Sequence, residues 1–267
     1  MYEKYYGLSE KPFSLTPDVD FFYQSFTHKE ALNVLLVAIK SGDGFIKVTG
    51  EVGTGKTMLC RKLLDALEAD FETIYIPNPY MNCNALLEAV VDEMGIVDKL
   101  GKENYLACIN KQLIDTARQS RGSVIILDEA QSLPEESLEA IRLLSNLETG
   151  KQKLIQIILF GQPELDAKLE KSSIRQLRQR IMHSYQLQPL TKNSIRAYLH
   201  HRVSSAGYCG PELFEASALQ RLYKISQGIP RIINVLCNKA MMLAYASGEF
   251  YINCKHIDAA ASDNQSQ

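Results

Sequence analysis

A glycine-rich octapeptide near the start of the chain restricts its fold more than any other feature. Residues 50 to 57 read Gly50, Glu51, Val52, Gly53, Thr54, Gly55, Lys56 and Thr57. Glycines at these spacings let the backbone wrap closely around a pyrophosphate, so that N–H groups and the N-terminus of the next helix point at phosphate oxygens. In such a loop the lysine contacts the β and γ phosphates, and the threonine hydroxyl binds Mg²⁺. The pattern therefore predicts a P-loop that binds ATP.

The flanking residues supply the strand and the helix that a P-loop requires. Residues 45–49 are β-branched and strand-like, whereas residues 58–67 have helical periodicity with charges on the other face. A strand, the loop and a helix in this order separate a P-loop from an ordinary glycine-rich turn. We therefore assign Lys56 to phosphate binding and catalysis, Thr57 to Mg²⁺, and Met58 to the ATP-binding segment.

An acidic pair follows a second apolar strand. Val124 to Leu127 precede Asp128 and Glu129, and ligands of open α/β sheets bind just outside the carboxyl ends of the strands. We expect Asp128 to hold Mg²⁺ through water, and Glu129 to orient and polarise the attacking water as a catalytic residue. The alternative is a solvated acidic pair that caps the helix expected at 135–147.

Strand and helix patterns alternate through the first two thirds of the chain. Strands are expected at 45–49, 73–76, 124–128, 154–160 and 184–187, and helices at 28–40, 56–68, 84–94, 104–119, 135–147 and 164–181. Such alternation is typical of a doubly wound α/β fold with a parallel sheet.

From residue 190 onward the pattern is purely helical. Helices are expected at 192–206, 215–226, 230–247 and 255–262. Pro189 ends strand pairing, and Thr191 is a suitable cap for the next helix. The expected division is an N-terminal segment with an αβα core at 1–189, followed by a small helical lid domain at 190–267.

The composition argues against several other classes of protein. A formal net charge of −2 leaves no global basic field for nucleic acid. The longest apolar stretch, residues 34–39, is far shorter than the roughly 20 residues that cross a bilayer, and no signal-peptide pattern is present. The six cysteines lack metal-ligand spacing and are interpreted as reduced thiols. We therefore expect a cytoplasmic protein without a membrane span.

Arg231 occupies an unusual position at the start of a predicted helix. It follows Gly228, Ile229 and Pro230, and a cation in the first turn opposes the helix dipole by ~0.3–1 kcal/mol unless it reaches an anion. ATP would be such an anion, so Arg231 is a candidate γ-phosphate sensor. The alternative is an exposed arginine with a surface role.

Three arginines precede the last expected strand. They are Arg175, Arg178 and Arg180. An arginine supplied by a neighbouring subunit stabilises transition-state charge in several nucleotide hydrolases, and Arg180, then Arg178, is our candidate for that role. A solvated basic face is the alternative.

Gln162 follows the strand expected at 154–160. Its amide is a candidate to contact the γ-phosphate or to hold the attacking water. It is equally compatible with a turn before Pro163.

Several segments together resemble one known family, the ExeA/GspA-type AAA+ ATPases. They are Tyr6-Gly7-Leu8, Lys11-Pro12-Phe13, the loop at 50–57, Leu127-Asp128-Glu129-Ala130-Gln131, Gly161-Gln162-Pro163-Glu164-Leu165 and Gly228-Ile229-Pro230-Arg231. The resemblance spans almost the whole chain. It is strongest to short MshM-type members, which are linked to biogenesis of the mannose-sensitive haemagglutinin pilus, a type IV pilus.

The resemblance implies a five-stranded parallel AAA+ core with a helical lid, ATP at the domain junction, and ring-like homo-oligomers that move a partner. It places Gln162 and Arg231 at the two sensor positions, although many AAA+ proteins have Asn or Thr where Gln162 stands. It places His28 near adenine, whereas a histidine before a helix is otherwise more often structural. The implied partner is a membrane-embedded pilus or secretion component at the inner membrane.

The sequence leaves three possible functions to be compared. The first is an assembly ATPase for a pilus or a related secretion apparatus. The second is an ATP-dependent regulator of nucleic acid, as in transposition, which the acidic isoelectric point disfavours. The third is an ATP switch of low turnover, which Glu129 disfavours because a pure switch needs no residue that activates water.

Overall fold

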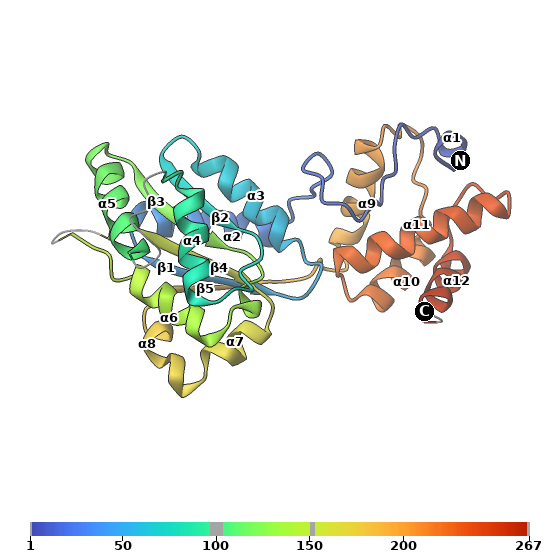
Figure 1. The fold of residues 1–267 in the computed structure, drawn as a ribbon. Helices are drawn as coiled ribbons and strands as arrows, with labels where there is room; N and C mark the ends of the chain where they lie inside the picture. The colour runs from blue at the N-terminus through green and yellow to red at the C-terminus, as the bar shows by residue number, and fades with distance from the viewer. Residues whose placement is uncertain (1, 97–103, 150–152, 266–267) are drawn as a thin grey trace. The chain divides into compact units, whose positions relative to one another are not determined.

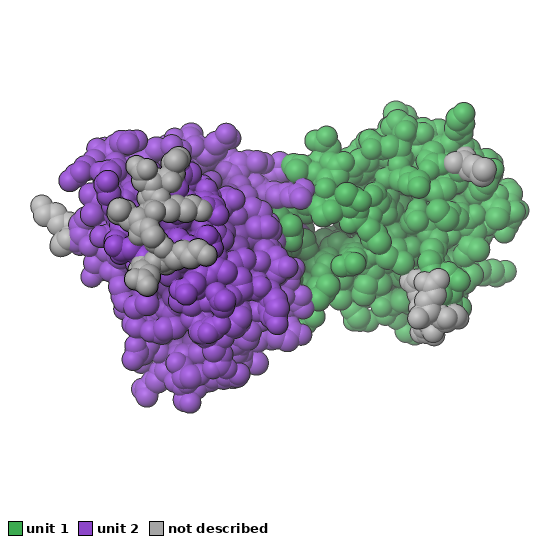
Figure 2. Space-filling model, in the orientation of Figure 1, with its two compact units in different colours: residues 1–27, 51–58, 188–267 green, residues 28–50, 59–187 purple. Residues whose placement is uncertain are grey.

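The computed structural model describes residues 2–96, 104–149 and 153–265, and these form two compact units. One unit, the sheet unit, comprises residues 28–50 and 59–187. The other, the helical unit, comprises residues 1–27, 51–58 and 188–267. Figure 2 shows the two units in different colours. Each is described by itself below.

The sheet unit contains a parallel sheet. Among the described residues its strands are β1 (Phe45–Gly50), β2 (Phe71–Ile76), β3 (Gly122–Leu127), β4 (Gln156–Gly161) and β5 (His183–Leu187). They lie in the order β2-β3-β4-β1-β5, and every neighbouring pair is parallel. The predicted five-stranded parallel core is thus confirmed, with strand boundaries displaced by one or two residues.

Helices cover both faces of this sheet (Figure 1). They are α2 (Phe26–Ser41), α3 (Lys56–Leu67), α4 (Cys83–Glu93), α5 (Tyr105–Arg118), α6 (Glu135–Leu144), α7 (Glu164–Leu169) and α8 (Arg175–Arg178). Successive strand residues point to opposite faces. Ile125 and Leu127 pack with α4 to α8, whereas Val124 and Ile126 pack with α2 and α3. Both faces of β3 are therefore buried, which explains its continuous apolar sequence.

The helical stretch predicted at 164–181 is broken into shorter pieces. After α7 come the 3₁₀ turn η2 (Ser172–Ile174) and the short helix α8. Lys171 has an extended backbone (φ −60°, ψ 142°), and its side chain and the Ser173 hydroxyl bind Glu135 of α6. Serine competes with the helix through such side-chain bonds, so the predicted helical stretch is present as short helical pieces rather than as one continuous helix.

The helical unit is built from α1 (Tyr2–Tyr6), α9 (Ser194–Ser205), α10 (Ala216–Ser226), α11 (Pro230–Ala246) and α12 (Cys254–Gln265). Its core also contains Tyr2, Tyr6, Phe13 and Phe21 of the N-terminal segment. The compact units therefore do not follow the expected division at residue 189. Residues 1–27 group with the helices after that point, because their aromatic side chains fill the helical core.

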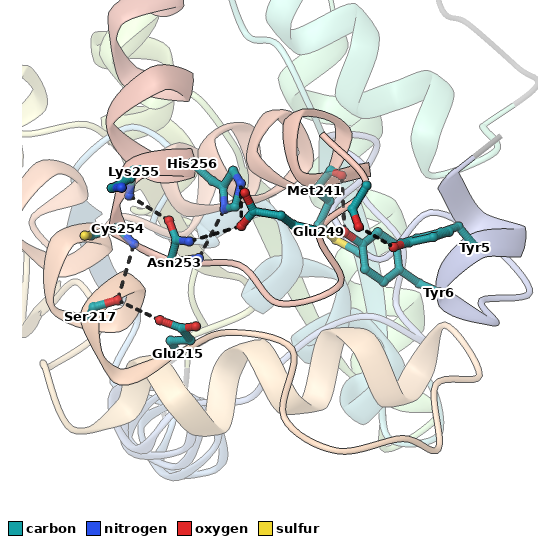
Figure 3. Close-up of polar contacts among 11 residues, drawn as sticks. Tyr5, Tyr6, Glu215, Ser217, Met241, Glu249, Asn253, Cys254, Lys255 and His256 are labelled. Atoms are coloured by element: carbon teal, nitrogen blue, oxygen red, sulfur yellow. Dashed lines mark hydrogen bonds and ion pairs between the residues drawn. The ribbon is translucent and has the colours of Figure 1, made fainter. Parts of the chain in front are cut away.

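Side-chain bonds fix the start of α12 (Figure 3). The Asn253 side chain accepts a hydrogen bond from the Lys255 N–H at 3.0 Å, and the His256 Nδ1 accepts one from the Asn253 N–H at 3.2 Å. The Cys254 N–H donates to Ser217 of α10 at 3.3 Å. Free N–H groups at a helix start need such partners. α12 therefore begins at Cys254 and packs against α10 and α11.

Across the described part of the chain, no helix combines the length and the apolar character needed to span a bilayer.

Candidate functional site

The P-loop residues of the helical unit fold around one carbonyl oxygen. Gly53 and Gly55 have left-handed backbones, with φ of 82° and 99°, which glycine adopts without steric cost. The Glu51 carbonyl accepts hydrogen bonds from the Thr54 hydroxyl at 2.8 Å and from the Lys56 ammonium at 3.0 Å. Lys56 is only 5% exposed. The loop therefore has the turn that phosphate binding requires, with its lysine held inward.

Gly53 also lies against the start of α11. The Arg231 N–H donates to the Gly53 carbonyl at 3.3 Å. A Cβ atom added to Gly53 would lie 2.4 Å from the Cβ of Arg231, so only glycine fits here. The Arg231 side chain is exposed and makes no hydrogen bond or ion pair with the other described residues. The structure thus brings Arg231 to the P-loop and leaves its guanidinium available.

The remaining P-loop residues have mixed exposure. Val52 is 49% exposed, and Thr57 and Met58 are half-buried in the first turn of α3. Gly50 is the last residue of β1 and belongs to the sheet unit. The loop therefore leaves directly from the carboxyl end of a central strand.

Asp128 lies directly after β3 and is 2% exposed. Its N–H donates to the carbonyl of Ile76 at 3.0 Å, and its Oδ1 accepts the Glu129 N–H at 2.9 Å. The Tyr75 hydroxyl on β2 also hydrogen-bonds Asp128. Burial raises the pKa of Tyr75 well above its ordinary value, and the Cys60 and Asp128 side chains raise that pKa further. Tyr75 therefore stays a neutral donor that orients the Asp128 carboxylate.

Glu129 has a left-handed backbone (φ 53°, ψ 38°), which costs a residue with a side chain roughly 1–3 kcal/mol. Its Oε2 accepts hydrogen bonds from the Gln131 amide at 2.5 Å and from the Gln162 amide at 3.0 Å. Its Oε1 accepts no hydrogen bond from the described residues. The structure thus brings Glu129 and Gln162 together, with one carboxylate oxygen held and the other open.

Three strand ends in the sheet unit meet at one edge. Thr49 of β1 is level with Gly161 of β4, and Leu127 of β3 is level with Leu159. Because the strands are parallel, Gly50 at the end of β1, Asp128 directly after β3 and Gln162 directly after β4 lie at the carboxyl ends of neighbouring strands, where ligands of open α/β sheets bind.

Arg180 lies at the opposite edge of the same sheet. It donates to the Ser145 hydroxyl at 3.0 Å, and Met182, two residues later, donates its N–H to the carbonyl of Phe45 at the start of β1. A strand of this length spans about 17 Å at ~3.3 Å per residue. Arg180 is therefore separated from Glu129 of its own chain by the length of the sheet.

Arg178 and His28 differ in exposure. Arg178 is exposed and lines an open polar cavity of about 490 Å³ with Lys47 and Asp166. His28 is 2% exposed in the first turn of α2.

The reading of the sequence missed two side chains that hold the acidic pair, Gln131 and Tyr75. Gln131 directly follows Asp128-Glu129-Ala130, and Tyr75 lies on the strand beside β3, one position before Ile76. Their closeness in sequence or in strand register was the available signal. Sequence alone does not show the direction in which either side chain points.

The oxygen donors suit Mg²⁺. This ion is usually held by one or two protein ligands together with substrate phosphates and water. Each unit contains one predicted hard oxygen donor, the Thr57 hydroxyl in the helical unit and the Asp128 carboxylate in the sheet unit. Within the described residues, no cluster of three or more His, Cys, Asp or Glu side chains is arranged to hold a metal. Taken one by one, the chemistry of these oxygens suits a metal that enters with a nucleotide.

Comparisons with known proteins agree with this geometry. The AAA domain family matches residues 39–169. General secretion pathway protein A of Aeromonas hydrophila is 42% identical over 263 residues, which are 98% of this chain and 48% of that protein. The chain thus spans about half the length of this curated relative.

Solved structures share the fold at low sequence identity. The Aeropyrum pernix ORC2 protein, in ADPNP-ADP complexes, matches with a TM-score of 0.68 and 19% identity over 96% of this chain and 72% of its own. Cdc6p from Pyrobaculum aerophilum matches with a TM-score of 0.70 and 18% identity over 94% of this chain and 70% of its own. The RuvB Holliday junction branch migration motor of Thermotoga maritima matches with a TM-score of 0.60 and 16% identity. The match covers 91% of this chain and 72% of that chain.

The strand order, the P-loop after β1 and the acidic pair after β3 define an AAA+ protein. Within that class, the identity along nearly the whole chain adds a finer assignment. The protein belongs to the family of General secretion pathway protein A, the ExeA/GspA-type AAA+ ATPases.

Proposed function

We propose that the protein binds Mg-ATP and hydrolyses it to ADP and phosphate. One observation carries the proposal: Glu129 stands at the sheet edge from which the P-loop leaves, with Oε2 held by two amides and Oε1 open. A general base needs both a fixed direction and a free oxygen. A protein that only binds nucleotide has no need for this arrangement at the cost of a strained backbone.

In this proposal the P-loop, residues 50–58, holds the nucleotide. Its N–H groups and Lys56 bind the phosphates, and Thr57 and Asp128 hold Mg²⁺. The metal supplies positive charge that offsets the negative charge developing on the phosphates. Glu129 orients the water and accepts its proton. His28 retains the role of a candidate near adenine, although its burial favours a structural one.

Two further side chains are proposed to sense the γ-phosphate. Gln162 already contacts the Glu129 carboxylate from the end of β4, so its amide lies beside the proposed base. Arg231 has an exposed guanidinium, and its backbone is attached to the P-loop at Gly53. Arg231 therefore links the state of the nucleotide to α11 of the helical unit.

Arg180 is proposed to act on the nucleotide of a neighbouring subunit. Its place at the far edge of the sheet rules out direct contact with Glu129 of its own chain. An arginine that completes a neighbouring site requires a homo-oligomer, and the ring-like arrangement implied by the family provides one. Arg178 is the second candidate, because its side chain is exposed.

The proposed role in the cell is to drive or regulate assembly of a secretion apparatus or of a type IV, MSHA-like pilus. Support comes from the relation to General secretion pathway protein A and from the resemblance to MshM-type proteins. The proposal places the protein in the cytoplasm, at the inner membrane through a membrane-embedded partner. A nucleic-acid substrate is disfavoured by the net charge of −2.

The test compares Lys56→Ala and Glu129→Gln with the wild type. Lys56→Ala is expected to lose ATP binding. Glu129→Gln is expected to bind ATP normally and to slow hydrolysis by about 10²-fold or more, measured as phosphate release. Gln119→Ala, an exposed change at the end of α5, is the matched control. Equal hydrolysis rates for Glu129→Gln and the wild type would refute the assignment and favour the switch.

A further inference from the structure

Gln131 uses both ends of its amide at the candidate site. Its Nε2 donates to Oε2 of Glu129 at 2.5 Å, and its Oε1 accepts the backbone N–H of Gln162 at 3.0 Å. One side chain therefore joins the loop after β3 to the end of β4. Glu129 and Gln162 also contact each other directly at 3.0 Å, so the three residues form a closed network.

The backbone that carries Gln131 is itself held. It lies in the 3₁₀ turn η1 (Ala130–Ser132). The Lys168 ammonium donates to the carbonyl of Gln131 at 2.5 Å and to that of Leu133 at 2.6 Å. Burial lowers the pKa of Lys168, which indicates that this ammonium is partly removed from water. The Ser132 hydroxyl closes the turn on the Glu129 carbonyl at 2.7 Å.

Close packing limits the directions that the Gln131 amide can take. A Cβ atom added to Gly161 would lie 3.3 Å from Oε1 of Gln131 and 2.7 Å from the Leu165 side chain. Glycine at 161 thus leaves the space in which the amide reaches the Gln162 N–H. With its backbone held and its amide bonded at both ends, Gln131 presents a fixed donor to Glu129.

We propose that Gln131 is a positioning residue for ATP hydrolysis: it holds Oε2 of Glu129 so that Oε1 faces the attacking water, and it ties this carboxylate to the backbone of Gln162. The proposal rests on the proposed ATPase function. A neutral amide holds the carboxylate without cancelling its charge, as a base requires. Errors of about 1 Å in the position of a catalytic group can cost about 10²-fold in rate.

The experiment measures single-turnover ATP hydrolysis and ATP affinity for Gln131→Ala and Gln131→Glu. Gln131→Ala removes both bonds. Gln131→Glu keeps an acceptor for the Gln162 N–H but turns a second carboxylate toward Glu129. Both are expected to slow hydrolysis about tenfold or more, within the range that a misplaced group costs, and to leave the dissociation constant for ATP within about twofold. Gln119→Ala is the control and should match the wild type.

A double-mutant cycle with Glu129→Ala separates positioning from a general effect on structure. If Gln131 acts through Glu129, then Gln131→Ala should slow the Glu129→Ala protein by less than about twofold. The same tenfold loss in both backgrounds would overturn the proposal. Unchanged hydrolysis in Gln131→Ala would also overturn it. Faster hydrolysis in that variant would do the same, because it would mean that the amide restrains Glu129.

The design also separates this inference from the proposed function. A wild type that hydrolyses ATP no faster than Glu129→Gln would refute the ATPase itself. A wild type that depends on Glu129 but is indifferent to Gln131 would refute only the positioning role. Thermal unfolding of each variant, expected within a few degrees of the wild type, reports whether a slower variant is still folded.

Discussion

At the scale of single residues, the backbone of Glu129 is the most demanding feature of the candidate site. Its left-handed conformation is one that side chains with a Cβ avoid and that glycine adopts freely. Network bonds from Gln131 and Gln162 and the bonds that close η1 hold it there. The protein thus gives up some stability at this position to direct one carboxylate.

This strain predicts that glycine at position 129 is more stable than alanine, which is the reverse of the order usual within a helix. Glu129→Ala and Glu129→Gly both remove the carboxylate and its bonds, and they differ in how well they accept a positive φ. Glu129→Gly is expected to have the larger free energy of unfolding, by about 1 kcal/mol, measured by chemical denaturation. At exposed Lys111 within α5 the order should be the ordinary one, with Ala more stable than Gly by about 1 kcal/mol. The same order at both positions would contradict the assigned conformation.

His201 on α9 predicts a dependence of stability on pH. Burial lowers its pKa below the ordinary value of 6.5, as does the neighbouring charge of Arg202. Among the described residues its Nε2 has no hydrogen-bond partner. The unfolded chain therefore binds a proton at His201 more readily than the native protein does. This contribution to stability is fully present above pH 6.5 and is lost as the pH falls from there through the lower pKa of the folded state.

The test measures the free energy of unfolding at pH 7.5 and pH 5. His201→Phe keeps an aromatic ring beside Tyr23, whose ring centroid lies 5.6 Å from that of His201. The variant is expected to lose less stability on acidification than the wild type. His200→Gln, an exposed neighbouring change, should retain most of the wild-type dependence. The same loss in His201→Phe as in the wild type would show that His201 does not contribute.

At the scale of elements, α9 attaches the N-terminal segment to the helical unit. Arg202 donates from Nε to the carbonyl of Pro12 at 2.6 Å, from Nη1 to Phe21 at 3.1 Å and from Nη2 to Ser14 at 3.2 Å. Its guanidinium also lies 4.8 Å from the centre of the Phe21 ring. One buried side chain thus satisfies three carbonyl groups of a segment that lacks regular structure.

Arg202→Lys tests this attachment, because an ammonium cannot reproduce the planar fork of donors. Buried carbonyls that lose a partner cost about 1–3 kcal/mol. We expect a loss of that size in the free energy of unfolding and faster proteolysis within residues 9–25. Arg196→Lys on the same helix is the control, since Arg196 is exposed and lies 3.7 Å from Glu212. Equal stability of the two lysine variants would contradict the role of Arg202.

The sequence was sufficient for the elements whose pattern is local. The β-branched, strand-like residues of β1 and the apolar runs of β3 and β4, together with the P-loop, predicted the parallel core and the motif residues. The sequence was insufficient where tertiary contacts decide the local structure. The break at Lys171 depends on Glu135 in another helix, and the packing of residues 1–27 on the helical unit depends on Arg202 in α9. The contact from Gln131 to Glu129 depends on side-chain directions that no periodicity encodes.

At the scale of the whole molecule, the side chains proposed to act in hydrolysis belong to both compact units, and the proposal for Arg180 adds a second subunit. Lys56 and Arg231 belong to the helical unit, and Glu129 and Arg180 to the sheet unit. Arg180 and Glu129 lie at opposite edges of one sheet, so a single chain is expected to lack a complete site. Specific ATPase activity should therefore rise with protein concentration.

Complementation between two inactive variants tests this arrangement directly. Arg180→Ala keeps its own P-loop and Glu129 but supplies no arginine, whereas Glu129→Gln supplies the arginine but lacks the base. Each alone is expected to hydrolyse ATP at least about tenfold more slowly than the wild type, because arginines supplied in trans contribute about 10³-fold or more elsewhere.

Mixed subunits in which Glu129→Gln donates Arg180 to an intact neighbouring site should recover ATPase activity above the sum of the activities of the two separate variants. Arg118→Ala, an exposed change on α5, mixed with Glu129→Gln, gives the activity expected when neither subunit lacks the arginine. If mixing Arg180→Ala with Glu129→Gln only averages their rates while the Arg118→Ala mixture stays active, Arg180 is not the arginine supplied in trans, and Arg178 becomes the next candidate for that role.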